Sequence, residues 1–459
     1  MKYLIAWIAA LGLSVPVFAE QTVPQSQMEI QLSFAPLVKQ SAPAVVNIYA
    51  TRMAEARGNS FLDDPFFQRF FEGAAPEPRA QNSLGSGVIL SADGIVVSNY
   101  HVVGMATDIR VVLNDRREYS ARVLLGDEAS DLAILQLEEA SDLPSLQLRA
   151  SDDVQVGELT LAIGNPFGVG QTVSSGIISG LARSGGSGGN GTGYFIQTDA
   201  PINPGNSGGA LVDMAGRLIG INTSILTRSG GSNGIGFAIP SDLVAEFVSQ
   251  AKAGSERFRR AWAGVSGQVL DYDMAASFGL DRSGGIIITD LHPISPFGAA
   301  GFEVGDVITA VDGQPVISAG EMLFRMSVGG IGNAAVVTRS RNGETSDVSV
   351  ELISAPDYPP RDFTVLDDDA ILTGLELALV NPAVSEELRL ALNVEGVVVV
   401  NTGVLAARVG LRRGDILEAV NSRVVESPTD VREELSSAGR GVRLYIIRGG
   451  SRVQLRFRL

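Results

Sequence analysis

A serine set between glycines is the residue of this sequence best suited to do chemistry. Ser207 lies in the segment Gly205-Asn206-Ser207-Gly208-Gly209. A hydroxyl is a poor nucleophile at neutral pH unless a neighbouring base takes its proton. Glycines beside it let the backbone turn sharply and aim N–H groups at a developing oxyanion. The segment therefore predicts a nucleophilic serine and requires a base in the folded chain.

The choice of base is restricted because the chain has only two histidines. His101 follows an apolar, strand-like run directly, whereas His292 lies in a duplicated region whose other copy has no histidine at the matching position. A third group must hold the imidazole in the right tautomer. Asp131 opens another apolar run, where a carboxylate can be partly buried and still face a cleft. The order His101, Asp131, Ser207, with spacings of 30 and 76 residues, predicts a catalytic triad.

The same pentapeptide matches the G-x-S-x-G pattern of α/β-hydrolases, and an isolated match can also be an accidental serine in a hairpin. The hydrolases run serine, acid, histidine along the chain. Here the histidine comes first, and short strands with glycine turns surround the serine without βαβ periodicity. The chymotrypsin order is therefore favoured over both alternatives.

Composition excludes several classes of protein. The 459 residues suit two to four domains, and 45% hydrophobic residues rule out a disordered chain. The absence of cysteine excludes thiol chemistry and cysteine-bound metals, and two histidines argue against a multi-histidine metal site. A formal charge of −16 argues against nucleic acid as a partner. We expect neither a metal nor a cofactor.

The N-terminus is typical of an export signal. A basic start at Lys2 is followed by an apolar stretch, and small residues end at Ala19. We expect residues 1–19 to be a signal peptide cleaved after Ala19, with the mature chain in the periplasm. An uncleaved anchor is the alternative. No later segment could span a bilayer, so we expect no membrane span after cleavage.

The sequence divides into a β-rich region and a duplication. Short β-branched runs between residues 83 and 240 predict a β-barrel or sandwich, and a helix with its N-cap at Ser241 would close this domain over 20–256. The segment 301–312 recurs 109 residues later as 410–421, a period that indicates two copies of a whole domain. We expect the copies at 260–354 and 370–459, separated by a linker over 355–369, each ending in a hairpin that turns at Asn342-Gly343 or Gly449-Gly450.

These motifs resemble the HtrA/Deg (Do-like) family of periplasmic serine endoproteases, and the duplicated domains resemble two PDZ modules. The resemblance implies a mainly β protein: a chymotrypsin-like double β-barrel followed by two small PDZ domains of β-sandwich-like, α+β type. The matching segments are Gly85-Ser86-Gly87-Val88-Ile89, Ser98-Asn99-Tyr100-His101-Val102-Val103, Ser130-Asp131-Leu132-Ala133, Ile163-Gly164-Asn165-Pro166-Phe167-Gly168, Gln197-Thr198-Asp199-Ala200, Asn203-Pro204-Gly205-Asn206-Ser207-Gly208-Gly209 and Gly234-Ile235-Gly236-Phe237-Ala238-Ile239-Pro240.

The resemblance also implies roles for residues. Ser207 would attack the scissile carbonyl, His101 would accept and return its proton, and Asp131 would orient the imidazole. The N–H groups of Gly205 and Ser207 would form the oxyanion hole. Trypsin-type pockets carry an aspartate six residues before the nucleophile, where this chain has Pro201, so cleavage after lysine or arginine is disfavoured.

Substrate contacts are predicted in two places. Ile225 and Leu226 resemble the family's pocket-lining loop and favour small aliphatic residues, although both could equally be core. Trp262-Ala263-Gly264-Val265 resembles the carboxylate-binding loop of the first PDZ copy, with Ala263 where leucine is commoner, and Thr373-Gly374-Leu375-Glu376 is the matching segment of the second.

Two further patterns remain open. The glycines of 186–191 fit G-x-G-x-x-G, but a strand follows, so a surface or regulatory loop is favoured over a dinucleotide site. The cluster Phe66, Phe67, Phe70 and Phe71 is either a local hydrophobic cluster or a regulatory loop that docks on a neighbouring subunit.

The predicted function is ATP-independent digestion of unfolded or damaged cell-envelope proteins, with PDZ grooves that bind peptide by strand addition. The family resemblance implies a homotrimer or a larger assembly of trimers. The competing class is a binding protein, either a chaperone or a PDZ scaffold with a degenerate protease domain. The intact His101, Asp131 and Ser207 argue against that class, although one chain could combine both roles.

Overall fold

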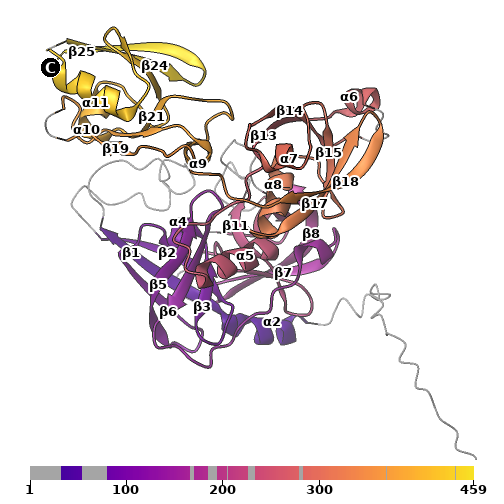
Figure 1. Cartoon of the computed structure of the whole chain (residues 1–459). Coiled ribbons are helices and arrows are strands. Elements are labelled where there is room, and N and C mark those ends of the chain that lie inside the picture. The colour runs from indigo at the N-terminus through magenta and orange to yellow at the C-terminus, as the bar shows by residue number, and fades with distance from the viewer. Residues whose placement is uncertain are drawn as a thin grey trace, which may run out of the picture.

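The structure is a computed structural model that describes residues 33–53, 80–165, 170–183, 194–203, 205–225, 233–278, 283–367, 370–439 and 441–458. Two closed six-stranded antiparallel barrels come first along the chain, and two further sheets, of six and seven strands, follow (Figure 1). This arrangement confirms the mainly β double-barrel fold with two further β-rich modules that the sequence predicts. The cluster Phe66, Phe67, Phe70 and Phe71 and the segment 186–191 lie outside the described residues.

The first barrel begins after a short helix and carries the apolar runs that the sequence marks as strands. Its strand order is β1-β2-β3-β6-β5-β4, and the side chains of β3 and most of β6 are buried. Valine, isoleucine and leucine suit such a closed, filled interior. Its elements are α2 (Ala35–Ser41), η1 (Ala42–Ala44), β1 (Val45–Met53), β2 (Ala80–Ile89), β3 (Ile95–Ser98), α4 (Tyr100–Val103), β4 (Asp108–Val112), β5 (Glu118–Asp127) and β6 (Leu132–Leu137).

The second barrel has the strand order β10-β11-β12-β9-β8-β7. Buried residues of both barrels, among them Val97, Leu135, Ile163 and Ile221, belong to one hydrophobic cluster, so the barrels pack as one body. The elements are η2 (Ser151–Asp153), β7 (Leu159–Gly164), β8 (Thr172–Arg183), β9 (Phe195–Thr198), β10 (Ala210–Val212), β11 (Leu218–Ile225), β12 (Gly236–Pro240) and the closing helix α5 (Ser241–Lys252).

The start of α5 differs in detail from the sequence prediction. Pro240 occupies the N-cap position, and Ser241 is the first helical residue. The buried Ser241 hydroxyl donates instead to the backbone carbonyl of Arg149. The hydroxyl therefore bonds to an acceptor far away in the sequence and does not cap the helix.

Each repeat folds into a separate antiparallel sheet with short helices. The first has the order β13-β14-β15-β17-β18 with β16 on β15. Its elements are β13 (Val265–Val269), α6 (Tyr272–Ser277), β14 (Ile286–Leu291), α7 (Pro296–Ala299), β15 (Val307–Val311), β16 (Gln314–Pro315), α8 (Ala319–Val328), β17 (Ala334–Arg341) and β18 (Glu344–Glu351).

The second repeat has the order β19-β20-β21-β22-β24-β25 with β23 on β22. The short strand β19 lies within the range predicted as linker. The elements are β19 (Thr364–Val365), β20 (Glu376–Leu379), α9 (Pro382–Leu388), β21 (Val397–Asn401), α10 (Gly403–Arg408), β22 (Ile416–Val420), β23 (Arg423–Val424), α11 (Pro428–Ser437), β24 (Gly441–Arg448) and β25 (Ser451–Arg458).

The two repeats share a buried charge contact. Arg341 Nε donates to buried Asp306 (2.6 Å), and in the second repeat Arg448 Nε donates to buried Asp415 (2.7 Å). A buried carboxylate needs such a partner, so the pair ties the last hairpin to the turn before β15 or β22. The recurrence supports the duplication that the sequence indicates.

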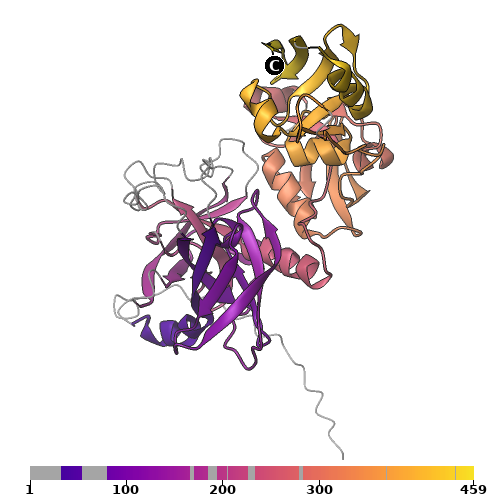
Figure 2. The same ribbon diagram turned by 90° about the vertical axis from the view of Figure 1, so that its left-hand side faces the viewer.

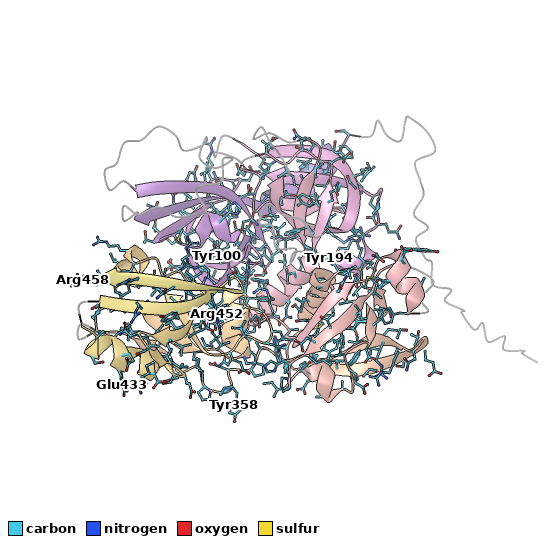
Figure 3. All side chains as sticks on the ribbon, turned by 90° about the horizontal axis from the view of Figure 1, so that it is seen from above. Tyr100, Tyr194, Tyr358, Glu433, Arg452 and Arg458 are labelled. Atoms are coloured by element: carbon cyan, nitrogen blue, oxygen red, sulfur yellow. The ribbon has the colours of Figure 1, made fainter. Side chains whose placement is uncertain are left out.

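The first repeat rests on the barrels through α8 (Figure 2). The ring of Phe324 stacks on Tyr194 with centroids 4.1 Å apart, and Arg325 on the same helix pairs with Asp152 at 3.0 Å. Figure 3 labels Tyr194 on the barrel side of this contact. No helix within the described ranges is long and apolar enough to cross a bilayer.

Candidate active site

His101 and Asp131 meet beside the first barrel. His101 lies on the short helix α4 directly after β3, and Asp131 ends the turn between β5 and β6. Nδ1 of His101 is 2.9 Å from each carboxylate oxygen of Asp131, and the backbone N–H of His101 donates to Oδ1 at 3.0 Å. Because the carboxylate only accepts, Nδ1 carries the proton and Nε2 can act as a base.

Ser207 reaches the same place from the second barrel. Its hydroxyl donates to the backbone carbonyl of Thr223 (3.1 Å). The side chain of Thr223 in turn donates to Oδ2 of Asp131 (2.6 Å). Thr223 on β11 therefore joins the predicted nucleophile to the predicted acid, so three positions far apart in the chain surround one site.

The charge of Asp131 changes the acidity of His101. Burial on its own would lower the pKa of His101, but the carboxylate charge and the hydrogen bond to it outweigh burial and raise the pKa above its usual value. The arrangement stabilises the imidazolium that forms when His101 accepts a proton.

The turn before Ser207 is fastened to strand β2. Gly205 has φ +94°, a conformation that favours glycine, and its carbonyl accepts a hydrogen bond from the hydroxyl of Ser86 (2.6 Å). The same hydroxyl accepts the N–H of Asn165 (2.8 Å), and the N–H of Ser86 donates to the carbonyl of Ser207 (2.9 Å). These contacts turn the Gly205 carbonyl toward β2.

An arginine beyond the barrels holds the turn that carries Asp131. Arg260 donates through Nη1 to Asp127 (3.2 Å) and through Nη2 to both Asp127 and the hydroxyl of Ser130 (2.7 Å). Asp127 also accepts the N–H of Ser130 (2.6 Å). Asp131 itself has φ +52°, which is unfavourable for aspartate, so its backbone needs such support.

The loop predicted to bind a peptide carboxylate, Trp262-Ala263-Gly264-Val265, leads into β13. Ser295 donates its hydroxyl to the carbonyl of Ala263 (2.6 Å), and the N–H of His292 donates to the carbonyl of Gly264 (2.9 Å). His292 therefore lies in the first repeat at this loop. The structure brings His101, and not His292, to Asp131.

Some predicted residues are only partly described. Ile225 ends β11 and faces Gly236 of β12 in the ladder, whereas Leu226 lies outside the described residues. The sequence reasoning did not single out Thr223, Ser86 or Arg260. Ser86 falls in a quoted motif, but the other two act through contacts across 92 and 130 residues, for which a single sequence carries no signal.

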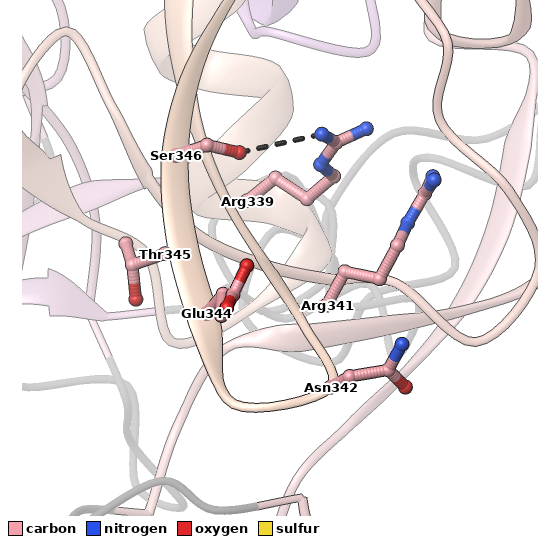
Figure 4. Close-up of a pocket in the computed structure, with 6 residues that line it drawn as sticks. All are labelled: Arg339, Arg341, Asn342, Glu344, Thr345 and Ser346. Atoms are coloured by element: carbon pink, nitrogen blue, oxygen red, sulfur yellow. Dashed lines mark hydrogen bonds between the residues drawn. The ribbon is translucent and has the colours of Figure 1, made fainter.

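Charged side chains also gather at the hairpin of the first repeat, around a surface hollow of about 420 Å³. Figure 4 shows Arg339 donating to Ser346 there, and the neighbouring Arg341 pairs with Asp306. These arginines are already paired, and none of the proposed catalytic residues lines the hollow. Among the described residues, no cluster of acidic and histidine side chains could hold a metal ion.

The double barrel and this site define a serine protease of the chymotrypsin class that carries two accessory β modules. Residues 85–221 match the family model described as a trypsin-like peptidase domain, and residues 264–352 and 396–448 each match a PDZ domain.

Several curated relatives match the chain over more than nine-tenths of both lengths. The chain is 38% identical to a probable periplasmic serine protease do/HhoA-like of Haemophilus influenzae over 97% of both chains. It is 36% identical to the periplasmic pH-dependent serine endoprotease DegQ of Escherichia coli, over 93% of this chain and 91% of the relative. It is 35% identical to the periplasmic serine endoprotease DegP of Escherichia coli over 98% of both.

A solved structure, the HtrA-type protease AlgW with a decapeptide, is 41% identical with a TM-score of 0.52 and covers 72% of this chain and 100% of its own. The chain belongs to the HtrA/Deg family of periplasmic serine endoproteases. The predictions of family, fold class, enzyme class and periplasmic location are confirmed.

Proposed function

We propose that this enzyme cleaves unfolded or damaged proteins of the cell envelope, with Ser207, His101 and Asp131 as its triad. In the first step Ser207 Oγ attacks the scissile carbonyl while its proton passes to Nε2 of His101. His101 then returns the proton to the leaving amine, and water repeats the sequence to release the acyl group. Asp131 keeps the proton of the neutral imidazole on Nδ1 throughout.

The hydrogen-bonded bridge through Thr223 carries this proposal. It ties Asp131, which contacts His101, to the backbone carbonyl that accepts from Ser207. The bridge supports the proposal because an activated serine needs its base nearby, and it links the serine hydroxyl to the carboxylate that contacts His101.

We assign the oxyanion hole to the N–H groups of Gly205 and Ser207. The hydroxyl of Ser86 holds the Gly205 carbonyl on the β2 side, and the N–H of Asn206 donates to the carbonyl of Asn203 (2.9 Å), so the peptide that lies between the two proposed donors is fixed at both ends. Loss of one oxyanion donor costs about 3–4 kcal/mol in comparable enzymes, so the shape of this turn decides whether the enzyme is active.

Substrate recognition is assigned to two regions. Ile225 and Leu226 would receive a small aliphatic side chain beside the cleaved bond, and Pro201 supplies no carboxylate for lysine or arginine. The loop Trp262–Val265 and strand β13 would take an extended peptide end. In support, β13 stands at the end of its described sheet and Gly267 to Val269 are exposed.

We also propose the division of the chain and its assembly. Residues 1–19 would be removed on export, leaving a protease domain over 20–256, PDZ domains over 260–354 and 370–459, and a linker over 355–369. Subunits would associate as trimers through their protease domains, or as larger assemblies of trimers. Mass spectrometry of the exported chain and of its native assembly tests both statements.

The function is tested with the mature protein and an unfolded substrate, beside the Ser207→Ala variant. Cleavage by the unsubstituted enzyme should exceed cleavage by the variant by about four to six orders of magnitude. Equal, negligible cleavage by both would refute the enzyme assignment. If both proteins also suppress aggregation of the substrate, the chain combines proteolysis with a chaperone role.

A further inference from the structure

The two PDZ domains differ at the strand where a peptide would bind. PDZ domains take an extended peptide by adding it as a strand to the edge of the sheet. In the first domain that strand, β13, is the end of the described sheet. In the second domain the matching strand, β20, carries one further strand at the same edge, β19, which comes from the segment before the domain.

The added strand makes a backbone ladder like that of a bound peptide. Thr364 and Val365 pair with Leu377 and Glu376 in antiparallel register. Beyond them, the N–H of Leu366 donates to the carbonyl of Leu375 (2.9 Å). The carbonyl of Leu366 accepts the N–H of Gly374 (2.8 Å), and Gly374 belongs to the segment that matches the carboxylate-binding loop of the first domain.

Leu366 also fills the position of a terminal side chain. It is 1% exposed and belongs to the same hydrophobic cluster as Val431 and Leu435 of α11. Its neighbours Val365 and Phe363 are 50% and 51% exposed. One aliphatic side chain is therefore buried between β20 and α11, which corresponds to α8 of the first domain, while the preceding side chain faces outward.

The chain enters the first domain differently. The chain runs from the end of α5 at Lys252 to the carboxylate-binding loop, and between them Phe258 packs its ring on Phe247 of that helix with centroids 3.8 Å apart. Phe258 thus belongs to the core of the protease barrels. The segment before the first PDZ domain therefore packs on the protease domain, whereas the segment before the second PDZ domain pairs with β20.

We propose that residues 361–366 are a built-in ligand of the second PDZ groove, so that peptides bind the first PDZ domain and reach the second only when this segment is displaced. This inference rests on the proposed peptide binding by PDZ domains. A tethered ligand acts at an effective concentration on the order of millimolar for a short linker. A free peptide with an aliphatic end must outcompete it.

The test uses the full mature chain with Ser207→Ala, so that the probe is not cut. The probe is a fluorescent decapeptide copying residues 357–366, which ends in a free carboxylate on Leu366. Leu366→Asp should release the segment, because a charge in this buried position is costly. Phe363→Asp places the same charge on an exposed side chain of the segment, outside the β19–β20 pairs, and serves as the matched control.

Binding of the probe is counted per protomer by titration calorimetry. The Leu366→Asp protein should bind one probe more than the parent, and the Phe363→Asp protein the same number as the parent. Probe sites counted in the parent belong to the first PDZ domain. If that domain does not bind peptide, the number of sites falls equally in all three proteins, and the difference between Leu366→Asp and the parent is unchanged. A folded Leu366→Asp protein, judged by circular dichroism, that gains no site overturns the proposal.

A second variant keeps the proposal testable if Leu366→Asp does not fold. The chain has no cysteine, so Val365→Cys with Glu376→Cys introduces one pair across the β19–β20 ladder. Directly opposed residues in antiparallel strands have Cα separations suited to a disulfide. Oxidation should leave the number of bound probes unchanged. Loss of one probe site on oxidation, regained on reduction, would show that the probe displaces the segment easily in the reduced protein. That result would overturn the proposal.

Discussion

At the scale of single residues, the proposed base His101 should set the pH range of the enzyme. In the proposed mechanism only neutral His101 can accept the proton of Ser207, and contact with Asp131 raises the pKa of His101. A raised pKa means that the neutral form is lost at a higher pH than for an ordinary histidine.

We therefore expect kcat/KM to fall as the pH drops, with a midpoint above about 6.5, the value of an unperturbed histidine. Below the midpoint the fall should approach tenfold per pH unit. Asp131→Asn should lower the midpoint and reduce kcat by about 10⁴, because the carboxylate that fixes the tautomer is lost. A midpoint at or below 6.5 in the unsubstituted enzyme would contradict this account.

Thr223 shows how a single residue can connect the members of a site. Its hydroxyl gives Asp131 a donor, and its carbonyl gives Ser207 an acceptor. The residue follows Asn222 in β11, where an apolar strand pattern gives no reason to single it out. The triad could be proposed from the sequence because the chain has only two histidines and one of them precedes Asp131 and the glycine-flanked Ser207, whereas the residue that connects them could not.

At the scale of elements, the turn between β5 and β6 depends on a side chain from outside the barrel. The guanidinium of Arg260 donates to both Asp127 and Ser130, and Ser130 directly precedes Asp131. Because Asp131 has φ +52°, its carboxylate direction relies on this turn.

Arg260→Gln should therefore lower kcat about tenfold, equal to about 1.4 kcal/mol, with KM nearly unchanged. Arg260→Lys should restore only part of the rate, since an ammonium cannot fork across two acceptors. The exposed neighbour supplies the control, as Arg259→Gln should change neither constant. A larger effect on KM than on kcat would show that Arg260 acts on substrate binding instead.

Elements set by local chemistry were the easiest to predict. Both expected hairpins are confirmed: Asn342-Gly343 joins β17 to β18, and Gly449-Gly450 joins β24 to β25, with positive φ at all four residues. The role of Ser241 was wrong in detail, and β19 was hidden in a range predicted as linker. In both cases a distant partner, the carbonyl of Arg149 or strand β20, decides the outcome.

At the scale of the whole molecule, the first PDZ domain is joined to the barrels by an ion pair whose arginine is buried and whose carboxylate is exposed. Arg325 lies between Asp152 of the protease domain and Glu321 of its own helix, and Glu321 has a side chain only 6% exposed. The Asp152 side chain is 44% exposed. The two carboxylates should therefore respond differently to loss of the arginine.

Arg325→Met should lower the free energy of unfolding by about 3 kcal/mol, because it leaves Glu321 buried without its cation. Asp152→Asn should cost at most about 1 kcal/mol, as expected for a solvent-exposed partner. Denaturant unfolding of each variant measures both values. Equal losses would contradict a buried role for Glu321, and adding Glu321→Gln to Arg325→Met should recover stability if the account is right.

Strand β19 also affects how far apart the two PDZ domains can lie. While residues 364–366 lie against β20, the chain is bonded to the second domain from Pro356 onward, so the free tether between the two PDZ domains ends near Pro356 rather than near Ala370. Release of the whole segment would add several residues of slack, each extending up to about 3.3 Å. The spacing of the two domains, and with it the size of the objects they can span, therefore depends on whether this segment stays bound to the second domain.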